Sequence, residues 1–213
     1  MQTKKVYIYI FNTMSDWEYG YLAAELNSGR YFKKDLAPLK VVTVGANKEI
    51  ITTMGGLSIK PDLSLDECTL ESDDLLILPG GTTWREMIHV PILERIGEAL
   101  KLGTIVAAIC GATEGLASMG YLDSRKHTSN NLEYIKMVCP NYKGEKFHEM
   151  KPAVADGNLV TASGLAPLEF AVEVLKKLDV FEPDTLDSWY KLNKTYSPEY
   201  FFQLMNSIKE KIQ

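Results

Sequence analysis

The stretch TIVAAICGAT, residues 104–113, carries the pattern that decides the fold. The residues before the cysteine form a short apolar run of the kind found in a strand buried on both faces. The run leads Cys110 directly into a turn of small residues, with Ala108 two positions before the cysteine and Ala112 two positions after it. This is the spacing of a nucleophile elbow, a sharp strand-to-helix turn that exposes a nucleophile and leaves room for only small neighbours. The sequence therefore predicts an α/β protein with a reactive Cys110 at the end of a strand.

The composition is that of an ordinary globular protein. The chain has 213 residues, of which 46% are hydrophobic and 24% charged, and this length fits one large domain or a domain with an appendage. The net charge of -5, without a basic stripe, argues against a nucleic-acid partner. The N-terminal apolar run 6–11 is too short for a signal peptide, and no run approaches the ~18 residues of a membrane span. We therefore expect a cytoplasmic protein that acts on a small-molecule substrate or oxidant and binds neither membranes nor nucleic acid.

The cysteines indicate a reducing compartment. Three are present, Cys68, Cys110 and Cys139, an odd number without a CxxC pair, so neither a disulfide framework nor a zinc site is expected. We expect no other metal and no cofactor. Cys68 and Cys139 lie in a loop and at a helix end, away from any elbow, and should be inert.

Short β-branched runs alternate with helical stretches, which is typical of a parallel sheet with helices on both faces. Strands are expected at 5–11, 40–45, 74–78 and 104–109, and helices at 16–28, at 91–102 and from just after Cys110 to near Gly120. Apolar residues recur at helical spacing in the first of these helices, and Gly29 follows its end. Cys110 should therefore lie at a helix N-terminus.

The second half of the chain continues the pattern and ends in helices. A short strand at 126–129, a helix capped by Asn130, a hairpin at 154–160 and an amphipathic helix at 165–178 are expected, and residues 181–213 carry two more helical segments. We expect a core domain at residues 1–180 and a helical extension at 181–213 that packs on it.

The position of Cys110 suggests its chemistry. A thiol at the end of a strand lies in the crevice where α/β folds bind ligands. The following helix contributes partial positive charge and unpaired N–H groups, so we expect a lowered pKa for the Cys110 thiol. The preceding strand ends at Gly80 and Gly81, whose backbone N–H groups could form an oxyanion hole with that of Gly111, although two consecutive glycines also fit a plain turn.

Several motifs, taken in order, resemble the DJ/PfpI family of the class I glutamine amidotransferase-like superfamily. They are LPGG at 78–81, AICG at 108–111, GYLDSRKHTS at 120–129 and TASGLAPLEFA at 161–171. The resemblance covers roughly residues 5–178. It implies a flavodoxin-like three-layer sandwich with a mostly parallel central sheet, a reactive cysteine on the elbow and a homodimer.

The resemblance also implies a partner for the cysteine. The family places a glutamate from just after the first strand within hydrogen-bonding reach of the cysteine, and Glu18 matches that position. A carboxylic acid in such a pocket can stay protonated and donate to a thiolate or a sulfinate. Residues 15–18, Ser-Asp-Trp-Glu, also form an S-x-x-E capping box, which is a competing explanation for Glu18.

The chain departs from the family in its histidines. Protease-like members follow the cysteine with a histidine, but here the next residue is Gly111, and the histidine that other members carry further on is replaced by Asn130. Asn130 and His127 are possible pocket residues, although strand alternation would aim His127 at the opposite face. The remaining histidines, in polar and surface-like contexts, should be structural: His89 and His148.

Two functions fit these residues. In the first, the protein is a cysteine-dependent hydrolase or amidase-like enzyme, or one that processes small carbonyl compounds, with Cys110 as nucleophile and Glu18 as its proton partner. In the second, it is a non-catalytic redox-sensing or stress-response protein in which Cys110 is oxidised to sulfenic or sulfinic acid. The missing histidine favours the second function or an activity that needs only Cys110 and Glu18. Trp84 is a candidate for the pocket wall or for packing in the core.

Overall fold

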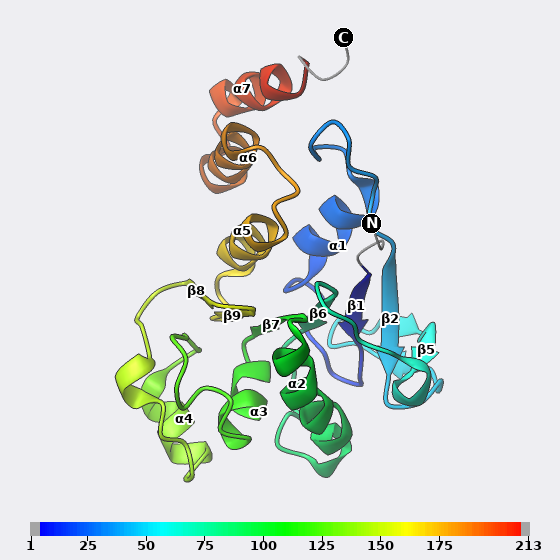
Figure 1. Ribbon diagram of the computed structural model, residues 1–213, viewed down its shortest axis with the longest axis vertical. Coiled ribbons are helices and arrows are strands. Elements are labelled where there is room, and N and C mark those ends of the chain that lie inside the picture. The colour runs from blue at the N-terminus through cyan, green and yellow to red at the C-terminus, as the bar shows by residue number, and fades with distance from the viewer. Residues whose placement is uncertain (1–4, 210–213) are drawn as a thin grey trace.

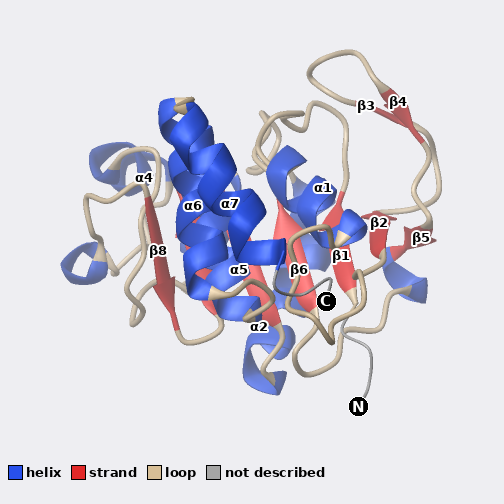
Figure 2. Cartoon of the chain, turned by 90° about the horizontal axis from the view of Figure 1, so that it is seen from above, coloured by secondary structure: helices blue, strands red, loops and turns tan. Residues whose placement is uncertain are grey.

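The core of the protein is a mostly parallel β-sheet in a computed structural model that describes residues 5–209. The strands are β1 (Val6–Tyr9), β2 (Val41–Gly45), β5 (Leu63–Ser64), β6 (Leu75–Leu78), β7 (Ile105–Ile109), β8 (Ala153–Asp156) and β9 (Leu159–Ala162). They form one sheet in the order β5-β2-β1-β6-β7-β9-β8. Every neighbouring pair is parallel except β8 and β9. A separate hairpin of β3 (Ile51–Thr52) and β4 (Ser58–Ile59) stands beside the sheet (Figure 2).

Helices cover both faces of the sheet (Figure 1). On one face lie α1 (Gly20–Ser28) and α5 (Pro167–Leu178), and on the other α2 (Val90–Leu102), α3 (Ala112–Ser118) and α4 (Leu132–Val138). Two C-terminal helices, α6 (Pro183–Thr195) and α7 (Pro198–Lys209), add an outer layer, with α6 packed on α5 and α7 on α6. This is the flavodoxin-like sandwich that the family resemblance implies.

The central strands form where the sequence is continuously apolar. All residues of β6 and β7 are buried, because helices cover both faces of a parallel sheet. The predicted hairpin is also confirmed: β8 and β9 are antiparallel, and Gly157 between them has φ of +59°, a left-handed conformation that glycine adopts without a steric penalty. The ends of β6, β7 and β9 therefore meet at one edge of the sheet.

The first helix begins later than the sequence predicts. It starts at Gly20 and not at Asp16, and Tyr19 at its N-cap makes no side-chain capping bond. Asp16 instead accepts a hydrogen bond from Gly55 N at 2.6 Å. The capping box at 15–18 is therefore not formed around this helix, because Glu18 is buried in the interior and contacts another loop.

Two other local predictions are corrected. Residues 126–129 do not form a strand but a single bridge between His127 and His148. The helix after them is capped by Asn131, whose Oδ1 accepts from Tyr134 N at 2.9 Å, and not by Asn130. The cap lies one residue later because Asn130 takes part in a tertiary contact, described below.

A buried polar contact attaches α6 to the rest of the protein. Trp189 is almost fully buried, and its Nε1 donates to Glu25 Oε1 at 3.0 Å. Glu25 on α1 is equally buried and is paired with Arg30. A buried carboxylate needs such donors, because an unpaired charge away from water is costly. The contact thus links α6 to α1 directly, whereas the predicted division of the chain at residue 180 stays a prediction.

We expect the change Trp189→Ala to lower the free energy of unfolding by about 3–5 kcal/mol, the usual cost of deleting a large buried aromatic side chain. Urea denaturation followed by far-ultraviolet circular dichroism measures it. Phe202→Ala, at an exposed position of α7, is the control and should change stability by less than about 0.5 kcal/mol. A wild-type unfolding midpoint for the Trp189 variant would show that α6 is not part of the cooperative unit.

Candidate functional site

Cys110 follows β7 at the carboxyl edge of the sheet, in a strained turn. Its φ is +59°, a left-handed conformation that costs a non-glycine residue energy and that recurs at functional sites. Its N–H donates to Ala162 O at 3.0 Å, and its carbonyl accepts from Thr113 N at 3.0 Å and from Thr113 Oγ1 at 2.6 Å. These bonds hold the elbow in place, and the side chain is half-buried.

Glycines surround the sulfur because nothing larger fits. A Cβ added to Gly80 would lie 2.5 Å from Cys110 Cβ and 2.9 Å from Cys110 Sγ, and one added to Gly164 would lie 2.7 Å from Sγ. A Cβ on Gly111 would lie 2.8 Å from the carbonyl oxygen of Gly81. Gly164 was not predicted to be a site residue, although it lies in the motif at 161–171. Its position after β9 was the signal that could have identified it.

Glu18 lies against the thiol from the loop after β1. The side chain is almost fully buried, and its Oε2 accepts a hydrogen bond from Gly80 N. Its Oε1 is buried and, within residues 5–209, has no hydrogen-bond partner of ordinary geometry. A Cβ on Gly164 would lie 3.0 Å from this Oε1 and 2.7 Å from Cys110 Sγ, so the free oxygen and the sulfur share one small space.

Burial sets the ionisation of this pair. It raises the pKa of the Glu18 carboxyl, an effect opposed by hydrogen bonds with Gly80, Cys110 and Ser15. Burial also raises the pKa of the Cys110 thiol, as does the neighbouring Glu18. The lowered thiol pKa expected from the helix N-terminus is therefore wrong, because desolvation outweighs the local donors. Two negative charges this close repel each other. When either the Cys110 thiol or the Glu18 carboxyl loses its proton, the other group therefore keeps its own.

Asn130 places an amide group on the sulfur. Its Nδ2 donates to Cys110 Sγ at 3.2 Å, a contact that lowers the thiol pKa because it stabilises the thiolate. Its Oδ1 accepts from Gly164 N at 2.8 Å and from Ser163 Oγ at 3.4 Å. These bonds fix which end of the amide faces the thiol.

The backbone amides are only partly arranged as an oxyanion hole. The Gly80 N–H is occupied by the Glu18 carboxyl, so the structure does not offer it to a substrate. The Gly111 N–H faces Cys110 and helps to lower the pKa of the thiol. Gly81 lies next to it, since a Cβ on Gly111 would be 3.5 Å from Gly81 N. Gly81 and Gly111 therefore stay candidates, and Gly80 positions Glu18.

Two tryptophans flank the site in different ways. Trp84 is buried, donates from Nε1 to Pro79 O at 2.8 Å and packs beneath the elbow, where a Cβ on Gly111 would be 3.1 Å from its ring. Trp17, which was not predicted to be a pocket residue, is exposed and donates from Nε1 to Gly164 O at 3.4 Å. Trp84 thus supports the turn, whereas Trp17 stands at its solvent side.

The three histidines of the chain make their hydrogen bonds elsewhere. His127 is fully buried, with Nδ1 bonded to Arg125 O at 2.7 Å and Nε2 to the Tyr142 hydroxyl at 2.6 Å. Both ring nitrogens are engaged, so the possible role of His127 in the pocket is not supported. Its pKa is lowered by burial.

His89 is not at the surface, as its sequence context suggested, but fully buried between Tyr9 and Thr83. Burial lowers its pKa to about 4. His148 is half-buried and bonds to Ser129 at 3.0 Å. Within residues 5–209 no histidine nitrogen is hydrogen-bonded to Cys110 or Glu18.

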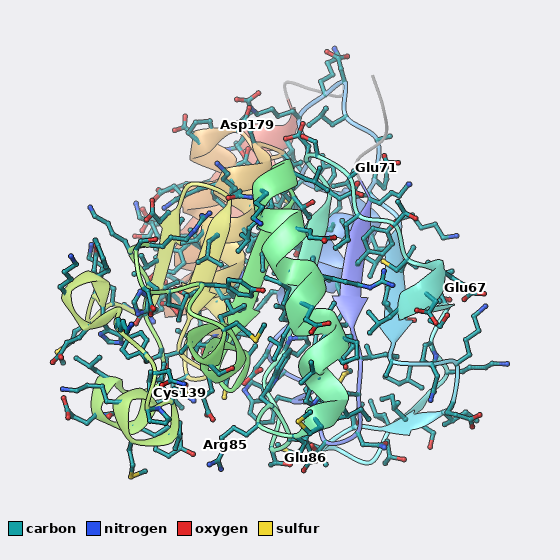
Figure 3. The ribbon with its side chains drawn as sticks, turned by 60° about the horizontal axis from the view of Figure 1, so that its bottom comes forward. Glu67, Glu71, Arg85, Glu86, Cys139 and Asp179 are labelled. Atoms are coloured by element: carbon teal, nitrogen blue, oxygen red, sulfur yellow. The ribbon has the colours of Figure 1, made fainter. Side chains whose placement is uncertain are left out.

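The other cysteines lack these features. Burial raises the pKa of Cys68 to about 11 and also raises the pKa of Cys139. Cys139 lies at the end of α4 (Figure 3), where its thiol donates to Glu114 O at 3.4 Å. In the part of the chain that the structure describes, neither thiol has a glycine-lined turn or a side-chain amide donor.

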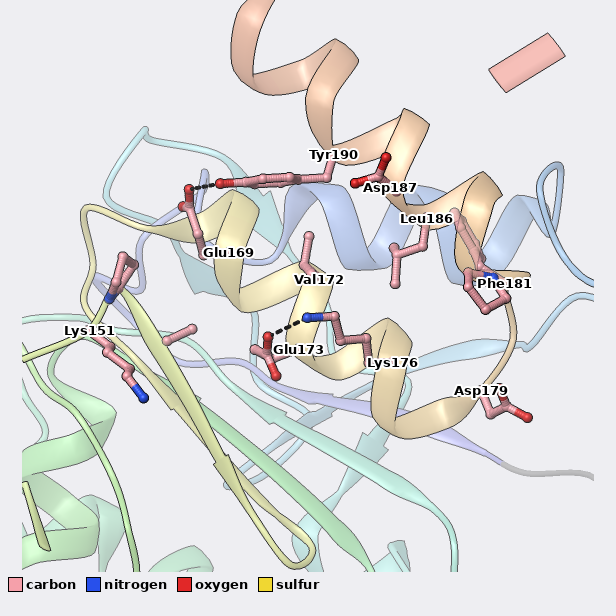
Figure 4. Close-up of a pocket in the computed structure, with 13 residues that line it drawn as sticks. Lys151, Glu169, Val172, Glu173, Lys176, Asp179, Phe181, Leu186, Asp187 and Tyr190 are labelled. Atoms are coloured by element: carbon pink, nitrogen blue, oxygen red, sulfur yellow. Dashed lines mark hydrogen bonds and ion pairs between the residues drawn. The ribbon is translucent and has the colours of Figure 1, made fainter. Parts of the chain in front are cut away.

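Two hollows bear on where a ligand could lie. One of about 450 Å³ is lined by Asn130 and Ser163, both next to the Cys110 site. Another of about 500 Å³ lies between α5 and α6 (Figure 4), where Glu169 is already bonded to Tyr190. Cys110 itself lines neither of these two hollows. Among residues 5–209, no group of three His, Cys, Asp or Glu side chains could hold a metal ion, and no helix is long and apolar enough to cross a membrane.

Comparisons with known proteins give a consistent result. The family model described as "DJ-1/PfpI family" matches residues 4–177. The chain is 78% identical to the protein named "Uncharacterized protease YoaZ" of Bacillus subtilis (strain 168), over 98% of this chain and 99% of that one. It is 32% identical to "Uncharacterized protease YdeA" of the same strain, over 90% and 91%.

A comparison with solved structures gives the same family. The crystal structure of a thiJ/pfpI family protein from Bacillus anthracis superposes with a TM-score of 0.96 and 83% identity, over 97% of this chain and 98% of that one. The matched residues include Glu18, Cys110, Asn130 and Gly164, which make up the site. The chain therefore belongs to the DJ-1/PfpI family.

Proposed function

We propose that the protein is an enzyme acting on small reactive carbonyl compounds such as 2-oxoaldehydes, with Cys110 as nucleophile and Glu18 as proton carrier. The observation that carries the proposal is the placement of Cys110 Sγ between the buried Glu18 carboxyl and the Asn130 amide. Peptide hydrolysis by cysteine normally uses a base beside the thiol, and in the described residues no histidine takes that place. Addition to an aldehyde needs only a proton donor and acceptor, which one carboxyl can be in turn.

The chemistry can be written with these residues and water. The thiolate of Cys110 attacks the aldehyde carbon, an S–C bond forms, and the carbonyl oxygen takes the proton of Glu18 to give a hemithioacetal. The Glu18 carboxylate then removes the proton from the same carbon, and the electron pair moves onto the adjacent carbonyl to give an enediolate. Glu18 returns this proton to the second carbon, and the hydroxyl on the sulfur-bearing carbon passes its proton to the second oxygen, which gives a thioester. Water hydrolyses it to a 2-hydroxy acid and restores the thiol, so no external oxidant or reductant is required.

The names of more distant relatives support this class of reaction. A protein of Caenorhabditis elegans named "Glutathione-independent glyoxalase DJR-1.2" is 24% identical over 66% of this chain. A Pyrococcus furiosus protein named "Deglycase PfpI" is 35% identical over 42% of this chain. We also propose the homodimer implied by the resemblance and the cytoplasmic location indicated by the cysteine count.

The half-buried position of Cys110 favours a second candidate, redox sensing. A thiolate there could attack a peroxide oxygen, with formation of an S–O bond, cleavage of the O–O bond and departure of hydroxide, and a second equivalent would give a sulfinate. The Asn130 amide and the Gly111 N–H would donate to the new oxygens. In this function the oxidation state of Cys110 is the signal.

We expect Cys110→Ser to abolish conversion of methylglyoxal to lactate, because the S–C bond cannot form. Glu18→Gln should lower kcat by about 100-fold or more, the usual contribution of a positioned acid–base group. Lactate is measured enzymatically after incubation with purified protein. Cys139→Ser is the matched control and should retain wild-type turnover. Turnover that survives both the Cys110 and the Glu18 change would exclude the proposed site.

Glu18→Gln should have the opposite effect on alkylation of the thiol. The neutral amide removes the negative charge that raises the Cys110 pKa, so the thiolate fraction at pH 7.5 should rise and iodoacetamide should react several-fold faster, about threefold for each half unit of pKa. Peptide mass spectrometry measures modification at Cys110. Glu133→Gln, which removes an exposed carboxylate nearby, is the control. Slower alkylation of the Glu18 variant would contradict the shared-proton description.

For the redox candidate, titration with hydrogen peroxide should add up to two oxygen atoms to the wild-type protein and none at this position to Cys110→Ser. Cys68 and Cys139 should stay unmodified longer, since burial raises their pKa values. Intact mass measures the uptake. Equal oxygen uptake by the serine variant would rule this candidate out.

A further inference from the structure

The Asn130 amide reaches the sulfur from a segment that is not a regular strand or helix. Residues 127–129 are joined to residues 147–149 by two backbone bonds: His127 N donates to Phe147 O at 3.1 Å, and Glu149 N donates to His127 O at 2.8 Å. These bonds form an isolated parallel β-bridge between His127 and His148. The path of the chain up to Asn130 is therefore set by the neighbouring segment.

Side chains continue this attachment toward Asn130. Thr128 N donates to Thr161 Oγ1 at 2.9 Å, and Thr128 Oγ1 donates to Lys151 O at 2.8 Å. The next side chain, Ser129, is buried and bonds to His148 Nε2 at 3.0 Å. This contact is the last one before Asn130, so it holds the residue from which the amide extends.

The second ring nitrogen of His148 fixes the direction of that bond. Nδ1 is buried and has no hydrogen-bond partner. A buried lone pair without a donor is tolerated better than a buried N–H without an acceptor, so the ring carries its proton on Nε2 and donates it to Ser129 Oγ. Burial and the neighbouring His127 lower the pKa of His148, and the ring is neutral at pH 7.5.

The charged and titratable groups around the ring are few. His127 lies edge-on, with ring centroids 5.4 Å apart. Lys151 and Glu133 line the same hollow as His148, and Lys151 is paired with Glu149 at 2.6 Å. Glu133 is paired with Lys136 at 3.4 Å, so both charged groups that line the hollow have a partner. The Ser129 hydroxyl is the polar group that the His148 Nε2 proton reaches.

Asn130 itself is exposed and would sample several rotamers if its backbone were free. Its two useful contacts, with Gly164 N and with Cys110 Sγ, require one position of the side chain. That position depends on where Ser129 is held. The hydrogen bond from His148 to Ser129 thus affects the sulfur indirectly, through the position of Asn130.

We propose that His148 is a positioning residue for Cys110, which acts through Ser129 to keep the Asn130 amide directed at the sulfur. The inference rests on the proposed role of Cys110 as a nucleophile. It assigns no proton transfer to His148 and no contact with substrate. Loss of the His148–Ser129 bond should weaken the amide-to-thiolate hydrogen bond, raise the pKa of Cys110 and slow its reaction with electrophiles.

The test is the pH profile of Cys110 alkylation by iodoacetamide, from pH 7 to 10, read by peptide mass spectrometry. His148→Leu and Ser129→Ala should lower the rate at pH 7.5 by up to about tenfold, as expected for loss of one hydrogen bond to a charged group, and move the profile to higher pH. His148→Gln, whose amide can also donate to Ser129, should restore most of the rate. This rescue distinguishes a positioning role from general loss of stability.

Tyr142→Phe is the matched control, because it breaks the hydrogen bond of His127 in the same cluster without touching Ser129. It should lower stability and leave the alkylation rate unchanged. Wild-type alkylation of the Leu variant, failure of the Gln variant to rescue, or an equal effect of Tyr142→Phe would overturn the proposal. Should His148→Leu not fold, Ser129→Ala and His148→Gln decide. Methylglyoxal turnover by Cys110→Ser would disprove the proposed function, whereas the alkylation result would stand apart from it.

Discussion

The close approach of two glycines to the Cys110 sulfur is the constraint on which the rest of the site depends. Gly80 follows β6, Cys110 follows β7 and Gly164 follows β9, and these strands are neighbours in the sheet. Parallel pairing brings their carboxyl ends to one edge, where the three turns converge. A side chain on either glycine would overlap the cysteine. The thiol is therefore flanked closely by backbone, and within residues 5–209 Glu18 and Asn130 are the residues that reach it with polar side-chain atoms.

This close packing explains why the pKa of the Cys110 thiol is raised, whereas an exposed thiol at the start of a helix would have a lowered pKa. Close backbone removes water from both the Cys110 sulfur and the Glu18 carboxyl, which raises the pKa of each. The donors that remain, Gly80 N for the carboxyl and Asn130 Nδ2 for the sulfur, are divided between the two groups. The first negative charge is thus shared, and the remaining proton stays within reach of any group bound at the sulfur.

The sequence predicted what depends on local patterns. The apolar run before Cys110 and the small residues around it specified the strand, the turn and the place of the nucleophile. The direction of the pKa shift of the Cys110 thiol could not be predicted in this way. The helix that follows Cys110 is visible in the local sequence, whereas Gly164, Glu18 and Asn130 reach the thiol from distant parts of the chain. Glu18 was identified only by the family resemblance. Locally, residues 15–18 favoured a capping box, and the interior contact with Gly80 replaced it.

The position of Asn130 shows why its role could not be read from spacing. A strand at 126–129 would alternate its side chains between two faces, but this segment forms only an isolated bridge whose course is set by residues 147–149. The two neighbouring asparagines consequently take different roles: Asn131 caps α4, and Asn130 contacts the thiol. The outcome matters chemically, because an amide neither gives up nor takes a proton near neutral pH. Of the side chains that contact the sulfur in residues 5–209, Glu18 is the one that can carry protons, so acid and base steps at Cys110 must alternate on that carboxyl.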